Sequence, residues 1–419
     1  MLIDAIRNIH KEFIELDKAD RKPILIVAFN LFAILFSYPM IRSASTAMFV
    51  DSFGAKNTPW VWILSVIGLA ISVSLFNIWQ KKRSIYFLYS SISLFSTFIF
   101  IACNTLSIFK VNLVAFPYYV WKEVYIVLLV HLSIGYLNTK VDYKVAKLTY
   151  GPLGALGSLG GILGGLLTAK LIPYVNSNFT SVDGLFIVGI LGTIIIFLTT
   201  FLFSTTRGEY LQKVEDKFES PLASLKDVKK YVFLMAAIVA ISQFVINLAN
   251  YKFNLSLEQF VIGAQDKGAF LGKVYSGINL ISFSFQILFI PILLKLVRVR
   301  ILHMVIPTIF GLFFITSMLT QGAFLPIALL FIVYKGLDYS LFSTAKEMLY
   351  FPLSKVQKFG AKYIVDMIVY RASKMLISVI LLIEKSAFFV DALLGICLII
   401  WVALASLLNA EHTKSTIDT

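Results

Sequence analysis

The feature that most constrains this chain is a series of twelve long apolar segments, each close to the roughly 20 residues that cross a bilayer as a helix. Of the 419 residues, 58% are hydrophobic and only 14% are charged, and a water-soluble protein of this size could not bury so much apolar surface. The sequence therefore predicts an all-α membrane protein with twelve transmembrane helices. The predicted spans are 24–47, 60–79, 84–106, 113–137, 150–173, 183–205, 231–251, 269–294, 301–320, 323–344, 361–383 and 387–409.

The basic residues are distributed unevenly among the connections between these segments. With a cytoplasmic N-terminus, 25 of the 37 lysines and arginines fall on the cytoplasmic side, seven on the outer side and its helix ends, and five within spans. This is the positive-inside pattern, and it predicts that both termini are cytoplasmic. The net charge of +14 is then a signal of topology, and no nucleic-acid partner is expected. We expect a multi-pass protein of a bacterial cell inner membrane.

The longest polar stretch, 206–230, separates the chain into two parts. It carries charges of both signs and Pro221, and it is interpreted as a cytoplasmic linker between spans six and seven. Residues 1–205 and 231–419 then hold six spans each, and the first part begins with a short amphipathic cytoplasmic helix at 1–22. Two six-helix halves around a central site are the plan of major-facilitator-type carriers.

The fifth span is rich in glycine, with pairs four residues apart at 157/161, 160/164 and 161/165. Small residues at that spacing let two membrane helices approach closely. A phosphate-cradling loop is the alternative, but the run lacks a Lys-Ser/Thr ending and lies inside a span. Tight helix packing is the better interpretation.

Charged side chains inside the spans are candidates for function, because an ionised group at mid-bilayer costs about 2.5–3.5 kcal/mol even on the lenient insertion scale. Arg42 closes the first span, where snorkelling to the interface is an equal alternative. Lys122 and Glu123 lie about ten residues into the fourth span, too deep for easy snorkelling. Adjacent helical residues point about 100° apart, so we expect one to face a central cavity and the other a neighbouring helix.

Two further pairs of charges are three residues apart and share a helical face. Lys335 and Asp338 can pair with each other, and a purely structural ion pair is the alternative to a functional one. Arg371 and Lys374 are like charges that repel in a low dielectric. Asp366 is offset in angle from Arg371, so an external anion would relieve the repulsion. This pair is the strongest signal of an anion site.

The charges placed deep in the spans sum to a positive core. The bases are Arg42, Lys122, Lys335, Arg371 and Lys374, and the acids are Glu123, Asp338 and Asp366. A surplus of two positive charges favours an anionic solute. In the seventh span, Asn247 and Asn250 add neutral polar groups three residues apart.

The run 338–353 (DYSLFSTAKEMLYFPL), which ends the tenth span, is the most specific motif. It resembles the nucleotide transporter family of plastids and intracellular bacteria, the ATP/ADP translocases. The following Gly360, Lys362 and Asp366, with the basic eleventh span, are also similar to the family. A second match is 116–165, where Glu123 stands at the position of a functional acid, and a third is Arg42 at the end of span one. The resemblance implies a twelve-span carrier that exchanges ATP and ADP.

Two positions depart from the family's pattern. Ser45 stands where the family has a lysine, three residues after Arg42. Asn250 stands where the family has a glutamate in span seven. The net charge is unchanged by these two losses, so an anionic substrate is still expected, but the implication of ATP/ADP exchange is weakened.

The hypothesis is alternating access, in which the two halves rock around a mid-membrane cavity. Arginine and lysine would bind phosphate oxygens, and the asparagines would contact the sugar or base. The residues expected to bind substrate are Arg42, Glu123, Asn247, Asn250, Arg371 and Lys374. Those expected to pair charges or latch the inner gate are Lys122, Lys335, Asp338, Lys346, Glu347 and Asp366.

The expected partners are an anionic small molecule (a nucleotide or related phosphate) and membrane lipids, and the protein is expected to be a monomer. No metal or cofactor is expected. Enzymatic activity is not expected, because the cytoplasmic segments carry no metal-ligand cluster, no nucleophile-base arrangement and no nucleotide-hydrolysis loop. The alternatives are a carrier of another organic anion or metabolite on the same fold and a non-transporting membrane receptor or assembly factor.

Overall fold

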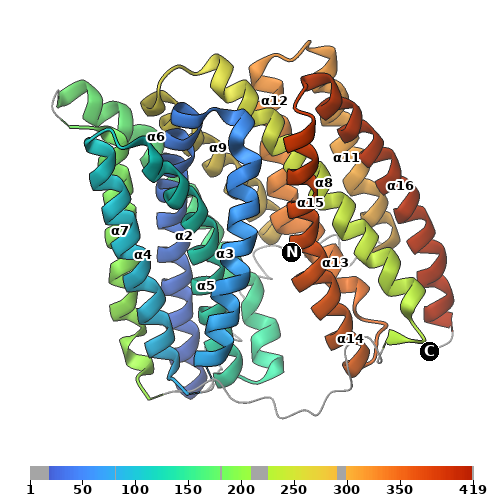
Figure 1. Cartoon of the computed structure of the whole chain (residues 1–419). Helices are drawn as coiled ribbons and strands as arrows, with labels where there is room; N and C mark the ends of the chain where they lie inside the picture. The colour runs from blue at the N-terminus through green and yellow to red at the C-terminus, as the bar shows by residue number, and fades with distance from the viewer. Residues whose placement is uncertain (1–17, 81, 180–181, 209–224, 290–298, 418–419) are drawn as a thin grey trace. The chain divides into compact units, whose positions relative to one another are not determined.

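A computed structural model describes residues 18–80, 82–179, 182–208, 225–289 and 299–417, and every regular element in these ranges is a helix (Figure 1). The prediction of an all-α protein is confirmed for this part of the chain. Helices satisfy all their backbone polar groups internally, which a segment in lipid must do. Most of the predicted amphipathic helix at 1–22 and of the linker 206–230 lies outside the described residues.

The predicted spans correspond to helices along the chain. The first six are α2 (Lys18–Phe53), α3 (Thr58–Trp79), α4 (Ile85–Ile108), α5 (Ala115–Lys140), α6 (Tyr143–Asn178) and α7 (Gly184–Leu202). The later ones are α8 (Lys229–Phe260), α9 (Ala264–Ser284), α11 (Val299–Leu319), α12 (Phe324–Leu337), α13 (Ser343–Leu349), α14 (Lys355–Lys362), α15 (Tyr370–Ile383) and α16 (Ala387–Ile417). Two π-helical turns interrupt the tenth and eleventh spans: η6 (Asp338–Phe342) and η7 (Tyr363–Val369).

Among the described residues, ten helices are long and apolar enough to cross a membrane. The predicted eighth and eleventh spans are not in that set. The eighth, 269–294, ends outside the described residues, and the eleventh, 361–383, is divided between α14, η7 and α15. The fold is therefore a multi-pass helical membrane fold, and the count of twelve stays a prediction.

The chain forms two compact units. Unit 1 comprises Met1–Phe53, Ile67–Val214 and Val261–Leu288, and unit 2 comprises Gly54–Val66, Glu215–Phe260 and Phe289–Thr419. In unit 1, α2 packs against α5, α6, α7 and α9, and α4 packs against α5 and α7. In unit 2, α8 packs against α12, α15 and α16. The predicted division into six-helix halves at 206–230 remains a prediction.

The glycines of α6 allow the closest helix contacts in unit 1. A Cβ added at Gly160 would lie 2.5 Å from the carbonyl oxygen of Phe32, and one at Gly164 would overlap that of Phe36, both on α2. On the other side of α6, a Cβ at Gly165 would lie 2.7 Å from the carbonyl oxygen of Gly272 on α9. The predicted tight helix packing is confirmed, and the alternative of a phosphate-cradling loop is wrong, because the glycines belong to one continuous helix.

Candidate functional site

The family-like run 338–353 begins at the π turn η6, directly after α12. π turns in otherwise α-helical segments are frequent at functional sites, because they re-aim side chains by one position. Lys335 and Asp338 form an ion pair here, with 3.0 Å between Nζ and Oδ2, and both are largely buried. The Lys335 ammonium also lies 4.5 Å from the centre of the Tyr339 ring. The predicted pairing is confirmed, and a role for it in transport stays a prediction.

Two crossed ion pairs connect α13 to the segment that follows it. Lys346 Nζ lies 2.6 Å from Asp366 Oδ1 in η7, and Lys362 Nζ of α14 lies 2.6 Å from Glu347 Oε2. These pairs bring together three residues that the sequence assigned to the inner gate. They also mean that Asp366 is neutralised by a lysine and not by the arginine five residues after it.

The same end of unit 2 is tied to α8. The Tyr231 hydroxyl donates a hydrogen bond of 2.8 Å to the carbonyl oxygen of Leu349. Burial, with the charge of Asp366 close by, raises the pKa of the Tyr350 phenol well above its ordinary value, so this side chain stays neutral. A Lys362 ammonium 5.2 Å from the Tyr350 ring centre adds a cation–π contact. The cluster fixes α13 against α8 and α14.

Arg371 and Lys374 lie one helical turn apart on α15. Arg371 is half-buried, and within the described part of the chain it forms no ion pair and no hydrogen bond. The acids of the neighbouring motif are all engaged by lysines. Lys374 Nζ lies 5.9 Å from the centre of the Trp62 ring. The structure therefore leaves in α15 a guanidinium to which no described carboxylate is matched.

Arg42 of unit 1 occupies a different setting. Its side chain is 8% exposed, and its guanidinium carbon lies 4.2 Å from the centre of the Tyr275 ring and 5.5 Å from that of Tyr38. The sequence placed Arg42 at the end of the first span, and the helix α2 continues beyond it for three further turns to Phe53. Snorkelling to the interface is excluded by the burial, and the cation is held between aromatic faces.

Lys122 and Glu123 of α5 are adjacent, and the expectation that one faces a central cavity and the other a neighbouring helix stays a prediction. They form an ion pair with each other, with 2.9 Å between Nζ and Oε1. Lys122 is 1% exposed, and its ammonium lies 3.4 Å from the centre of the Tyr119 ring. Backbone directions about 100° apart do not prevent contact, because the long lysine side chain can bend across the gap. The substrate-binding role of Glu123 and the charge-pairing role of Lys122 stay predictions.

The asparagines predicted in span seven lie on α8. The Asn247 side chain donates a hydrogen bond of 2.7 Å to the Gln243 carbonyl oxygen, so it is partly used by its own helix. Asn250 is half-buried and makes no hydrogen bond to a described residue. Ser45 stands in span one where the family has a lysine, and its hydroxyl donates a hydrogen bond of 3.3 Å to the Arg42 carbonyl oxygen. Neither departure places a charge near Arg42 or Arg371.

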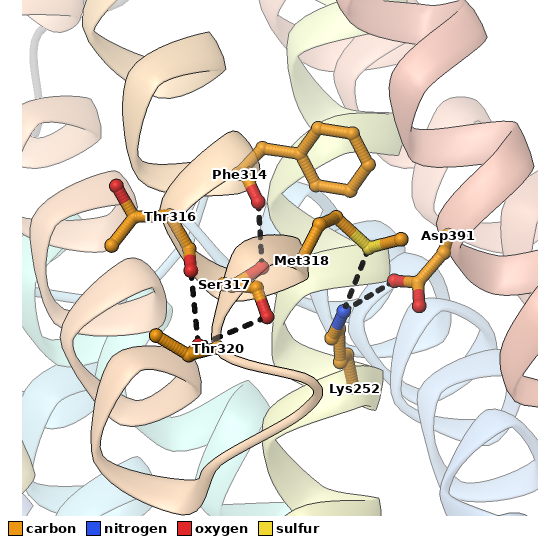
Figure 2. Close-up of polar contacts among 7 residues, drawn as sticks. All are labelled: Lys252, Phe314, Thr316, Ser317, Met318, Thr320 and Asp391. Atoms are coloured by element: carbon orange, nitrogen blue, oxygen red, sulfur yellow. Dashed lines mark hydrogen bonds and ion pairs between the residues drawn. The ribbon is translucent and has the colours of Figure 1, made fainter.

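A further ion pair in unit 2 joins two residues that are far apart in the sequence. Figure 2 shows Lys252 of α8 pointing toward Asp391 of α16, with Met318 of α11 beside it. Lys252 Nζ forms a short ion pair with Asp391 Oδ1 and lies 3.8 Å from the Met318 sulfur. The two charged side chains are 11% and 19% exposed. Lys252 follows a predicted span and Asp391 lies at the start of another, so nothing in the sequence paired them.

Replacing Asp391 by asparagine is expected to destabilise the protein by about 2–3 kcal/mol, because it leaves the Lys252 ammonium largely buried without its counter-charge. The cost is set below that of a fully buried pair because Asp391 is partly exposed. Thermal unfolding in detergent measures it. Asp266→Asn, at an exposed carboxylate in the first turn of α9, is the control and should cost less than about 1 kcal/mol. Equal melting temperatures for Asp391→Asn and the unchanged protein would show that the ion pair adds nothing.

No family model matches the chain. The curated protein "ADP,ATP carrier protein 3" of Rickettsia bellii is 23% identical to it, and the alignment covers 95% of this chain and 96% of that protein. The resemblance to the ATP/ADP translocases that the motifs indicated is thereby confirmed along nearly the whole chain, as that of a divergent relative.

Solved structures show the fold. A bacterial homologue of the human lysosomal transporter Spinster superposes with a TM-score of 0.67 at 10% identity, over 96% of this chain and 99% of that one. The nucleoside transporter NupG superposes with a TM-score of 0.64 at 14% identity, over 93% of this chain and 98% of that one. A D-xylose-proton symporter superposes with a TM-score of 0.65 at 12% identity, over 93% of this chain and 97% of that one. The fold is therefore major-facilitator-like.

Proposed function

We propose that the protein is a secondary carrier that moves a phosphorylated anion, a nucleotide in ATP/ADP-type exchange, across the inner membrane of a bacterial cell by alternating access. The likeness to an ADP,ATP carrier and the major-facilitator-like fold support transport. The substrates in the names of the structural neighbours differ from one another, so the choice of a phosphorylated anion rests on the side chains.

The observation that carries the proposal is the state of Arg371. A half-buried guanidinium in a predicted span is costly unless an anion reaches it. Every acid of the adjoining motif already has a lysine partner: Asp338 pairs with Lys335, Asp366 with Lys346, and Glu347 with Lys362. A planar guanidinium binds two oxygens of one phosphate at once, so a phosphate group is an anion that fits Arg371.

The proposed roles follow from these contacts. Arg371 and Lys374 of unit 2 bind phosphate oxygens. Arg42, held by tyrosine rings, is proposed as a substrate-binding cation of unit 1. The ion pairs of α13 with α14 and η7 break and re-form as the carrier changes state, and they act as the inner latch. Because Asn250 is neutral, the bound anion meets no carboxylate at that position of α8.

Wild-type protein in proteoliposomes is expected to take up labelled ATP or ADP, and uptake should rise when the vesicles are preloaded with unlabelled nucleotide. The measurement compares each nucleotide with its nucleoside. Because Arg371 binds the phosphate, the nucleoside should not be carried and should compete far more weakly than the nucleotide. Transport of nucleosides at the same rate as nucleotides would contradict the proposal.

The main competing function is a carrier of another organic anion on the same fold, and Arg371 fits its carboxylate as well as a phosphate. The same vesicles decide between the two, with di- and tricarboxylates and sugar phosphates as competitors of nucleotide uptake. A thermal-shift screen of the purified protein adds a second readout, because a ligand at a hundred times its dissociation constant stabilises by about 2.7 kcal/mol. Stabilisation by carboxylates alone would favour the competing function, and stabilisation by no solute would favour a receptor.

A further inference from the structure

A continuous polar stripe runs along one side of α8. At about 100° per residue, positions 243, 247, 250, 251, 254 and 258 fall within about 100° of one another. They are occupied by Gln243, Asn247, Asn250, Tyr251, Asn254 and Glu258. Apart from the asparagines at 247 and 250, the stripe was not singled out from the sequence, although its spacing of three and four within an apolar span is a readable signal.

Several atoms of this stripe are buried and lack hydrogen-bond partners. Asn254 is 1% exposed, and in the part of the chain that the structure describes neither its amide nitrogen nor its amide oxygen has a partner. The same holds for the amide nitrogen of Gln243, which is 2% exposed, and for the hydroxyl of Tyr251. Buried polar groups are nearly always hydrogen-bonded, so four such atoms on one side of one helix need an explanation.

One residue of the stripe has a partner within unit 2, because the Glu258 carboxylate accepts a hydrogen bond of 2.7 Å from the Ala55 backbone N–H. The four buried atoms above gain no partner among the described residues. On one side, Phe253 stacks on Phe331 of α12 with ring centres 4.9 Å apart. On another side, Lys252 pairs with Asp391 of α16. The amides of the stripe point away from both contacts by the helical spacing. Water or a bound solute must therefore satisfy them.

We infer that this stripe, with Asn254 and Gln243 as its principal residues, binds the uncharged, hydrogen-bonding portion of the carried solute, which for a nucleotide is the nucleoside. The inference rests on the proposed function. Amides offer a donor and an acceptor side by side, which matches the edge of a nucleobase or the hydroxyls of a sugar. A phosphate needs cations, and the stripe has none. Recognition is thus divided between cations on α15 for the phosphates and amides on α8 for the neutral part.

If the stripe binds a solute, replacing Asn254 by leucine, a side chain of similar size, should change stability and affinity in opposite directions. The unliganded protein should melt at a higher temperature, because an unpartnered buried amide is replaced by an apolar group. Nucleotide affinity should fall by about tenfold, because the solute loses its partner. A structural asparagine would give the opposite result for stability.

The experiment compares ATP with tripolyphosphate, which carries the phosphates without a nucleoside, as competitors of labelled ATP uptake. Asn254→Leu should raise the inhibition constant of ATP about tenfold and leave that of tripolyphosphate unchanged. Ser256→Ala is the matched control: its hydroxyl is also buried and unpartnered among the described residues, but it lies on the opposite side of α8. This variant should leave both constants unchanged.

The possible outcomes distinguish a failure of the nucleoside site from a failure of the proposed anion carrier. A lower melting temperature for Asn254→Leu, an equal loss for both competitors, or the same loss in Ser256→Ala overturns the stripe as a nucleoside site. Wild-type protein that binds tripolyphosphate as tightly as ATP overturns the stripe and leaves the anion carrier standing. Wild-type protein that binds neither competitor overturns the proposed function, and with it the ligand assigned to the stripe.

Discussion

Replacing Arg371 by alanine is expected to lower nucleotide uptake at limiting substrate by about 10- to 100-fold. Hydrogen bonds to a charged group contribute about 1.5–3 kcal/mol each, and a factor of ten corresponds to about 1.4 kcal/mol. Arg371→Lys retains the charge but loses the planar fork, so it should recover part of the activity only. The initial rate of labelled ATP uptake into proteoliposomes measures both variants.

The loss must be separated from a loss of folding. Arg371 makes no ion pair or hydrogen bond with another described residue, so its removal should leave the melting temperature of the empty protein unchanged or higher. Arg83→Ala is the control, since Arg83 is an exposed arginine that lies over the Phe87 ring at 4.8 Å. Wild-type uptake by Arg371→Ala, alone and combined with Lys374→Ala, would falsify the anion site.

The features that the sequence predicts correctly are those set by residues that lie close together in the chain. Two predicted spans, 60–79 and 84–106, agree with α3 and α4 to within about two residues at each end, because hydropathy reports the bilayer crossing directly. The Lys335–Asp338 pair was also predictable, since both residues lie on one turn. The first span was predicted to end at 47, and the helix α2 runs to Phe53, because hydropathy marks where the chain leaves the bilayer and not where the helix ends.

The site itself depends on contacts between distant residues, and these carry no local signal. Asp51, beyond the predicted end of the first span, pairs with Lys267 of α9 at 2.8 Å, across more than half the chain. Lys346 takes Asp366 as its partner, so the acid nearest to Arg371 in sequence is engaged by a residue twenty positions away. The sequence could place like charges on one face of a helix, but it could not say which acids were already engaged.

The glycines of α6 combine both kinds of information. Their four-residue spacing predicts a close helix contact, but the spacing does not identify the partner, which is α2 on one side and α9 on the other. Nor does it distinguish glycines that contact a neighbour from those that do not. Gly151, on the same helix, has no atom within 4 Å of the position that its Cβ would take. At Gly164 the carbonyl oxygen of Phe36 occupies that position.

Gly164→Ala is therefore expected to destabilise the protein by about 3 kcal/mol, the upper end of the usual cost of overpacking, because the added methyl group meets the backbone oxygen of Phe36, which cannot rotate away. The helices α2 and α6 must separate, and α2 also carries Arg42. Gly151→Ala should be neutral or slightly stabilising, since alanine favours the helix and meets nothing. Size-exclusion profiles and thermal unfolding of both variants in detergent measure the difference. If the two alanines behave alike, the close approach of α6 to α2 is wrong, and the setting described for Arg42 must be revised with it.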